Sequence, residues 1–147
     1  MQKGVDYIGV GIGAVIVNSE GKMFMSKRGM AARNEAGKWE FPGGALEFGE
    51  GLEETIKREI KEEFGMEIEI VNQLEPFNHL ISEEKQHWVA LCFVAKIISG
   101  VPTIMEPEKS AAIGWFSLEE VEKMDLAQTA KHRLKQIKGK YPGGLPK

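Results

Sequence analysis

Apolar residues recur along the chain in two patterns, one typical of a helix and one typical of strands. Ile56, Ile60 and Phe64 follow one another at spacings of four, so they lie on one side of a helix within residues 51–66. Other apolar runs alternate with polar residues or continue unbroken, as strands do. The strands predicted in this way span residues 7–17, 23–27, 39–41, 67–71, 87–97 and 114–116.

Polar segments between these runs predict the turns and the remaining helices. Residues 18–22 and 82–86 have the composition of hairpin turns. Ser117 and Glu120 have the spacing of a capping box, which predicts the start of a helix, and a last amphipathic helix is predicted for residues 126–137. Strands and helices mix without strict β-α alternation, which indicates an α/β sandwich with a mixed β-sheet.

The chain is long enough for one domain with a substantial core. Its 147 residues show no internal repeat and no linker, so we expect a single domain over residues 1–140. Residues 141–147 contain a Pro-Gly-Gly run that no helix follows, and we expect them to form a flexible C-terminal tail.

Carboxylates gather on the helix side opposite the apolar stripe. Glu59 and Glu63 are neighbours at a spacing of four, and Glu62 lies beside them. Three like charges so placed repel one another unless a cation lies among them, and hard divalent cations such as Mg²⁺ prefer carboxylate oxygens. The alternative is a solvated helix face that is stabilised by ion pairs one turn apart, such as Glu53 with Lys57.

Two groups of glycines suggest close backbone approach. A Gly-Gly turn at residues 43–44 lets the backbone come near a ligand, and beside a metal-binding helix it suggests phosphate chemistry. Gly9, Gly11 and Gly13 alternate along one face of the first strand, but they lack the G-x-G-x-x-G spacing of a dinucleotide site. We expect packing of another backbone against that face, with ligand contact as the alternative.

The spacing of glycine and carboxylates is more specific than either feature alone. Gly44 is followed after five residues by Glu50, and after seven more by the run REIKEEFGM at residues 58–66. Residues 44–66 resemble the Nudix box at every defined position, and the resemblance extends from about residue 5 to about residue 121. It implies the Nudix-type α-β-α sandwich and the hydrolysis of a nucleoside diphosphate linked to another group.

The resemblance also implies roles for the box residues. Glu59, Glu62 and Glu63 would ligate Mg²⁺, or Mn²⁺ as the alternative metal, with help from the carbonyl of Gly43. Glu59 or a neighbouring carboxylate such as Glu62 would act as general base for the attacking water. Arg58 would orient Glu59 through a charge-assisted pair. The metal lowers the pKa of bound water and neutralises charge on the phosphates.

Residues outside the box are candidates for binding the substrate. Arg28 stands near the phosphate site and is predicted to clamp phosphoryl oxygens, with an ordinary solvated arginine as the alternative. Glu40 belongs to the run WEFPGG at residues 39–44, which looks like the corresponding run of MutT-type enzymes. Glu106 and Glu108 lie in a loop where MutT-like relatives often place a further carboxylate, and Glu108 is the candidate for substrate binding. A solvated loop acid is an equal alternative for either residue.

The resemblance to MutT-type nucleoside-triphosphate diphosphatases predicts hydrolysis of an NTP or dNTP to the monophosphate and pyrophosphate. Hydrolysis of ADP-ribose or another nucleoside diphosphate derivative is the leading alternative, although Ile81 stands where ADP-ribose hydrolases often carry a proline. A second alternative is a Nudix protein that only binds its ligand. Such proteins usually lose a box carboxylate, and this chain keeps them all.

Composition limits the partners. A formal net charge of −3 argues against coating a nucleic acid polymer or a membrane surface, and no apolar run approaches the length of a membrane span. We therefore expect a cytoplasmic protein with a small nucleotide substrate. Homodimers are common in the family, and composition singles out no interface for one.

The cysteine and the aromatic residues are expected mainly in the core. Cys92 lies in an apolar run, and as the single cysteine it cannot form a disulfide within the chain. The three histidines lack zinc-ligand spacing. Five aromatic residues are candidates to stack on a nucleobase, although we expect most of them to be core residues: Trp39, Phe41, Phe77, Trp88 and Trp115.

Overall fold

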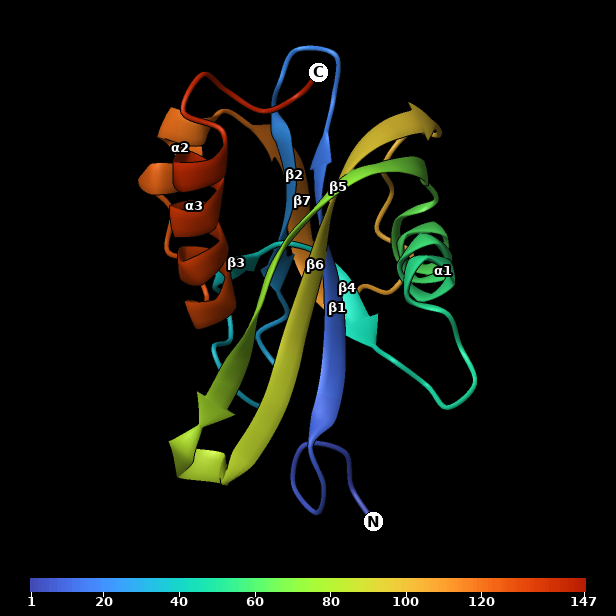
Figure 1. Ribbon diagram of the computed structural model, residues 1–147, viewed down its shortest axis with the longest axis vertical. Helices are drawn as coiled ribbons and strands as arrows, with labels where there is room; N and C mark the ends of the chain where they lie inside the picture. Colours follow the sequence, from blue (N-terminus) through green and yellow to red (C-terminus); the bar gives the residue numbers. More distant parts are fainter.

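The computed structural model describes residues 1–147 as one mixed sheet with helices on both of its faces (Figure 1). The sheet has seven strands in the order β3-β2-β1-β6-β5, with β4 paired to β1 and β7 paired to β2. β1 and β6 run parallel, and the other pairs are antiparallel. The strands are β1 (Gly9–Val17), β2 (Met23–Arg28), β3 (Trp39–Glu40), β4 (Gly43–Ala45), β5 (Glu67–Ile81), β6 (Gln86–Ser99) and β7 (Ser110–Phe116).

Three α-helices complete the sandwich. α1 (Leu52–Phe64) covers one face of the sheet, while α2 (Leu118–Glu122) and α3 (Gln128–Lys140) lie against the other (Figure 1). A short 3₁₀ turn, η1 (Ser82–Glu84), joins β5 to β6. The predicted α-β-α sandwich with a mixed sheet is confirmed. None of the helices is long and apolar enough to cross a membrane.

The predicted apolar face of α1 is confirmed by its burial. Ile56 and Ile60 are fully buried and Phe64 is 1% exposed, and all three belong to the core cluster between α1 and the sheet. Burying each such side chain contributes about 1.5–3 kcal/mol. Gly65 ends the helix in the left-handed region at φ 70°, where its N–H donates to the carbonyl of Lys61.

β1 contributes to the core on both faces of the sheet. Ile12 and Ile16 belong to the cluster on the α1 side, whereas Val15 and Val17 belong to the cluster on the α3 side. Successive strand side chains point to opposite faces, so one strand can serve both clusters. The glycines of β1 continue the row of Val15 and Val17, and they therefore face α3.

Several predicted boundaries differ from the structure. β4 was not predicted, because Gly-Gly-Ala has no strand propensity and is held by its pairing with β1. β5 extends ten residues beyond the predicted end at residue 71, past register shifts between Ile70 and Asn72 and between Leu74 and Phe77. These irregularities interrupt the alternation on which the prediction relied. The capping box of Ser117 is confirmed.

The C-terminal residues make contacts of their own. Tyr141 and Leu145 pack against the core cluster on the α3 side, and the Tyr141 hydroxyl accepts a hydrogen bond from Asn72 at 2.8 Å. The predicted flexibility of residues 141–147 stays a prediction, but two of these residues are anchored by packing.

Candidate active site

The sheet opens beside β1, and residues 40–45 pass through the opening. β1 pairs with β2 at Val17 and Met23, next to their hairpin. Nearer the start of β1, at residues 11–13, the neighbouring strand on the same side is β4. The N–H of Ala14 donates to the carbonyl of Pro42 at 3.0 Å, which fixes the segment between the two strands.

Two cavities meet at this segment. The smaller has a volume of about 410 Å³ and is bounded by α1 and by the residues that precede β7. The larger, of about 520 Å³, is bounded by α3 and by the strands β1, β5 and β6. A single ligand can therefore extend from one face of the sheet to the other across the segment. The residues that line both cavities are Arg28, Glu40, Gly43, Gly44 and Ala45.

The smaller cavity is lined by two of the three carboxylates that were predicted to bind metal. Glu59 and Glu63 line it from successive turns of α1, where they flank the buried stripe and are themselves half-buried, and do not lie opposite that stripe as predicted. Burial raises the pKa of Glu63 to about 8, and the hydrogen bond with Glu59 and the negative charges of Glu59 and Glu106 add to this effect, while Lys109 opposes it. A partly buried site with this excess of negative charge favours a bound cation.

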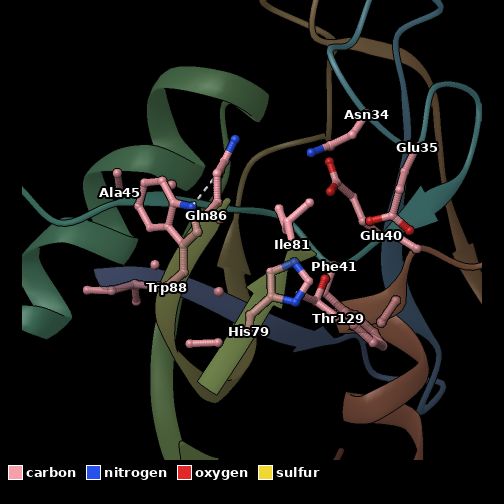
Figure 2. A pocket seen from close by; sticks show the side chains of 18 of the residues that line it. Asn34, Glu35, Glu40, Phe41, Ala45, His79, Ile81, Gln86, Trp88 and Thr129 are labelled. Carbon is pink, nitrogen blue, oxygen red and sulfur yellow. Dashed lines mark hydrogen bonds between the residues drawn. The ribbon is translucent and has the colours of Figure 1, made fainter. Parts of the chain in front are cut away.

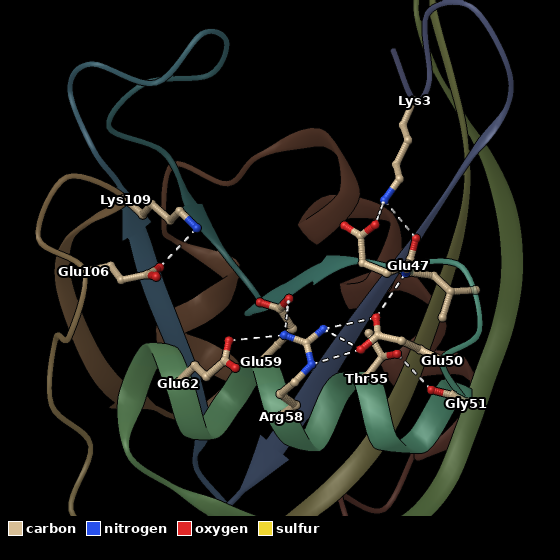
Figure 3. A network of polar contacts seen from close by, with 11 residues as sticks. Lys3, Glu47, Glu50, Gly51, Thr55, Arg58, Glu59, Glu62, Glu106 and Lys109 are labelled. Carbon is tan, nitrogen blue, oxygen red and sulfur yellow. Dashed lines mark hydrogen bonds and ion pairs between the residues drawn. The ribbon is translucent and has the colours of Figure 1, made fainter. Parts of the chain in front are cut away.

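Glu62, the third predicted carboxylate, does not line this cavity. Its side chain is 56% exposed, and its Oε2 accepts a hydrogen bond from Nη1 of Arg58 at 3.1 Å (Figure 3). Arg58 donates two further bonds to Glu50, from Nε at 3.0 Å and from Nη2 at 3.1 Å. Its Nη1 also lies 3.3 Å from Oε1 of Glu59. Arg58 thus links three box carboxylates, and its pairing with Glu59 is consistent with the predicted orienting role.

The donor set fits a hard divalent cation that is bound through few protein ligands. No three His, Cys, Asp or Glu side chains converge on a single metal-sized point. Mg²⁺, however, is usually held by one or two carboxylates together with waters and substrate phosphates. Glu59 and Glu63 meet that requirement, and Gly43 lines the same cavity. The ligation of metal by Gly43, Glu59 and Glu63, and by Glu62 as a third carboxylate, stays a prediction.

Arg28 is held by partners within the protein. Its Nη1 donates to Oε1 of Glu40 at 3.0 Å, and its Nε and Nη2 donate to the carbonyl and the side-chain oxygen of Asn34, each at 3.1 Å. Every guanidinium nitrogen therefore has a partner within the protein, and each of the two terminal nitrogens keeps a second N–H for a further acceptor. Burial raises the pKa of Glu40, and Arg28 opposes this rise. The substrate-binding roles of Arg28 and Glu40 stay predictions.

The larger cavity has aromatic and polar walls (Figure 2). Trp88 is fixed in orientation because its indole Nε1–H donates to Oε1 of Gln86 at 2.8 Å. His79 lies beside it on β5, and burial lowers the pKa of this histidine, so it is neutral at pH 7. Glu35 reaches the cavity from the loop before β3, and its carboxylate accepts a hydrogen bond at 2.8 Å from the N–H of Gln128 at the start of α3.

The glycine row of β1 explains why the larger cavity exists. A β-carbon on Gly9 would lie 2.5 Å from the Trp88 ring, so this glycine is needed for packing. A β-carbon on Gly11 would meet nothing within 4 Å, although Gly11 lines the cavity. Gly9 therefore packs closely as expected, but against a side chain and not against another backbone. At Gly11 no packing is found, and bare backbone forms part of the cavity wall.

The remaining predicted side chains divide between the core and the site. Glu108 lines the smaller cavity, and its role stays a prediction. Trp39 and Trp115 pack against the core clusters, and Cys92 is buried as predicted. Of the five aromatic candidates, Phe41 and Trp88 line the larger cavity.

Several residues that line the larger cavity could not be recognised from any pattern in the sequence. Asn34 and Glu35 lie in a polar loop without periodicity, and only the fold brings them beside Gln86. Ala127, just before α3, and Ala130 within it are small residues spaced by three, and they could have indicated a close approach of this helix to the sheet.

Comparison with known proteins agrees with this geometry. The family model described as NUDIX domain matches residues 8–137 of this chain. The crystal structure of a MutT NUDIX hydrolase from Burkholderia pseudomallei is similar, with a TM-score of 0.80 and 35% identity over 88% of this chain and 97% of that one.

Two curated relatives carry more specific names. The 8-oxo-dGDP phosphatase NUDT18 of Danio rerio is 33% identical over 100 residues, which are 68% of this chain and 28% of that protein. The ADP-ribose pyrophosphatase of Methanocaldococcus jannaschii is 28% identical over 111 residues, which are 74% of this chain and 62% of that protein. The chain thus spans less than two thirds of the length of either relative.

Proposed function

Because this chain belongs to the Nudix family and is a Nudix hydrolase, we propose that it hydrolyses a nucleoside triphosphate, NTP or dNTP, to the monophosphate and pyrophosphate. The observation that carries this proposal is the connection between the two cavities. One holds a carboxylate pair suited to Mg²⁺, and the other has the size and the walls of a nucleoside site. They share the Gly43-Gly44 turn.

The larger cavity suits the nucleoside. Its volume of about 520 Å³ lies within the usual range for small-molecule sites, roughly 300–1,000 Å³. The bare backbone at Gly11 offers a flat surface for a planar base, and Trp88 supplies an aromatic wall beside it. Glu35 and the neutral His79 offer polar contacts to the edge of the base.

The smaller cavity suits the phosphates. Mg²⁺, with Mn²⁺ as the alternative, would be held by Glu59, Glu63 and the Gly43 carbonyl, and it would supply neutralisation of phosphate charge and a lowered pKa for bound water. We assign to Glu59 the acceptance of the proton from the attacking water, because Glu59 lies at the junction of the cavities and Arg58 holds it at 3.3 Å. The water oxygen bonds to phosphorus as the bridge between the α- and β-phosphates breaks. The group that leaves with the bond's electron pair is pyrophosphate if the water attacks the α-phosphorus, or the nucleoside monophosphate if it attacks the β-phosphorus.

Localisation, partners and oligomeric state belong to the same proposal. We propose a cytoplasmic enzyme that acts on small nucleotides and not on nucleic acid polymers, either alone or as a homodimer. ADP-ribose remains the second candidate substrate, since one relative bears the name ADP-ribose pyrophosphatase. A second alternative, that the site binds a nucleotide without turnover, is disfavoured because the box keeps all its carboxylates.

A hydrolysis panel tests the proposal. The protein is incubated with Mg²⁺ and with canonical and oxidised NTPs and dNTPs, the corresponding diphosphates, ADP-ribose and dinucleoside polyphosphates. Monophosphate, pyrophosphate and phosphate are resolved as products. Preferred release of monophosphate and pyrophosphate from a triphosphate supports the proposal. Faster release of AMP and ribose phosphate from ADP-ribose would support the same active site with ADP-ribose as its substrate. No hydrolysis of any compound in the panel would favour binding without turnover.

A further inference from the structure

We infer that Lys109 binds the terminal phosphates of the substrate and thereby makes the site selective for a triphosphate chain. This inference rests on the proposed function and adds to it a residue outside the box. Lys109 is exposed, and it lines the smaller cavity together with Glu59 and Glu63. Figure 3 shows Lys109 and Glu106 above the surface of α1 that carries Glu59 and Glu62.

The arginines near the cavity are already engaged. Arg28 donates from all three of its nitrogens to Glu40 and Asn34. Arg58 donates to Glu50 and Glu62 and also lies within 3.3 Å of Glu59. Acceptors of the protein therefore hold both guanidinium groups in place and take three of the five N–H donors of each.

Lys109, in contrast, has one ion-pair partner. Its Nζ lies 3.1 Å from Oε2 of Glu106, and its side chain is 61% exposed, so the ammonium can turn to a phosphate while its stem stays in place. The backbone of Lys109 is fixed on both sides, because its N–H donates to the carbonyl of Glu106 and its carbonyl accepts from the N–H of Gly29, each at 3.0 Å.

The order of the cavities places Lys109 at the far end of the phosphate chain. Lys109 lines the smaller cavity but not the larger one, whereas Gly43, Gly44 and Ala45 line both. A nucleotide whose base lies in the larger cavity passes its phosphates across residues 43–45 before they reach Lys109. The ammonium therefore meets the phosphates that are most distant from the nucleoside, which a triphosphate has and a monophosphate lacks.

Lys109→Met tests this inference when it is compared with Lys109→Arg and with Lys57→Met, which removes an exposed charge on α1 outside both cavities. For Lys109→Met we expect kcat/KM to fall for nucleoside triphosphates by roughly 10-fold or more, the usual effect of losing a hydrogen bond to a charged group. The kcat/KM for ADP-ribose, which has no terminal phosphate, should change much less. Lys109→Arg and Lys57→Met should keep the wild-type ratio of the two substrates.

Binding of inorganic pyrophosphate in the presence of Mg²⁺, measured by calorimetry, separates this inference from the proposed function. If Lys109→Met binds pyrophosphate about 10-fold more weakly than wild type, the inference holds even where no nucleotide is hydrolysed. Equal affinity of wild type and variant, or no binding by wild type, would overturn it. An equal loss of activity on triphosphates and ADP-ribose would also overturn it, since Lys109 would then act only on the charge of the carboxylate cluster.

Discussion

The carboxylate of Glu59 lies against the backbone of Gly44, and the contact leaves no room for a side chain. A β-carbon on Gly44 would come within 2.5 Å of the Glu59 carboxyl carbon and within 2.8 Å of both of its oxygens. The first glycine of the box and Glu59, which are separated by 14 residues of sequence, are thus parts of one contact. The glycine lets the turn and the carboxylate share the edge of the smaller cavity.

Gly44→Ala should therefore displace Glu59 without unfolding the protein. We expect Mg²⁺-dependent turnover to fall by at least about 10-fold, because small displacements of catalytic groups are costly. Gly139→Ala is the matched control, since a β-carbon on Gly139 meets nothing within 4 Å and the residue lies at the end of α3. Turnover and melting temperature are measured for both variants. Wild-type turnover in Gly44→Ala would show that the position of Glu59 is unimportant.

Glu63→Gln should abolish most of the turnover while the fold is retained. The change keeps the size of the side chain and removes the charge that is needed to bind Mg²⁺. We expect a loss of at least about 10²-fold, since even the outer partners of metal ligands contribute roughly 10–100-fold. Glu53→Gln, on the exposed first turn of α1, is the control and should be neutral. Mg²⁺-dependent hydrolysis that survives in Glu63→Gln would remove Glu63 from the metal site.

The pKa of Glu63 predicts opposite effects of pH on stability and on metal binding. The folded protein holds a proton up to about pH 8, whereas the unfolded chain releases it near the ordinary value of 4.5. This group therefore contributes stability that is fully present below about pH 4.5 and is lost as the pH rises through 8. Mg²⁺ must displace the proton, so its affinity should increase over the same range.

Thermal unfolding of the metal-free protein between about pH 5 and pH 9 checks the first effect, and Mg²⁺ titration by calorimetry checks the second. Glu63→Gln is the reference, because it lacks the titrating group. The melting temperature of wild type should fall relative to that of the variant as the pH rises. Parallel melting curves for the two proteins would contradict a raised pKa at Glu63.

Ile60→Asp should unfold the protein. Ile60 is fully buried between α1 and the sheet, so the variant loses apolar packing and places a charge where it has no partner. Together these changes should cost roughly 4 kcal/mol or more. Lys57→Asp, one turn earlier on the exposed side of the same helix, should melt close to wild type. A normal transition in Ile60→Asp, seen by circular dichroism, would mean that the helix faces are reversed.

The box and its helix were predictable because local sequence determines them. The spacing of Ile56, Ile60 and Phe64 sets the buried side of α1 in any fold, and Glu59 and Glu63 then lie along the edge of that side. The α/β sandwich was predictable for a similar reason, since the periods of the apolar residues distinguish the strands from the helices along the chain.

The larger cavity was not predictable, because its residues meet only through the register of distant strands. Gly11 faces Ala90 across the parallel pair of β1 and β6, and that pairing joins segments about 80 residues apart. The hydrogen bonds around Arg28 were unpredictable for the same reason. A basic residue near a phosphate site suggests a clamp, but the loop that brings Asn34 to its guanidinium has no pattern that reveals the contact.

Filling the bare backbone at Gly11 should weaken substrate binding selectively. A β-carbon there has open space, and valine is favoured in strands, so Gly11→Val should fold with a melting temperature near that of wild type. The new side chain would occupy the wall on which we place the nucleobase. We expect KM to rise by about 10-fold, which corresponds to about 1.4 kcal/mol, while kcat changes little because the carboxylate pair lies in the other cavity.

Gly11→Ala should give a smaller increase in KM than Gly11→Val, and Gly139→Ala, remote from the cavity, should give none. Steady-state kinetics on the preferred nucleotide measures all three variants, and pyrophosphate binding gives a second readout. Because pyrophosphate lacks a base, its affinity should be the same in Gly11→Val and in wild type. An unchanged KM in Gly11→Val would place the base elsewhere, and a weaker affinity for pyrophosphate would mean that the substitution disturbs the phosphate site.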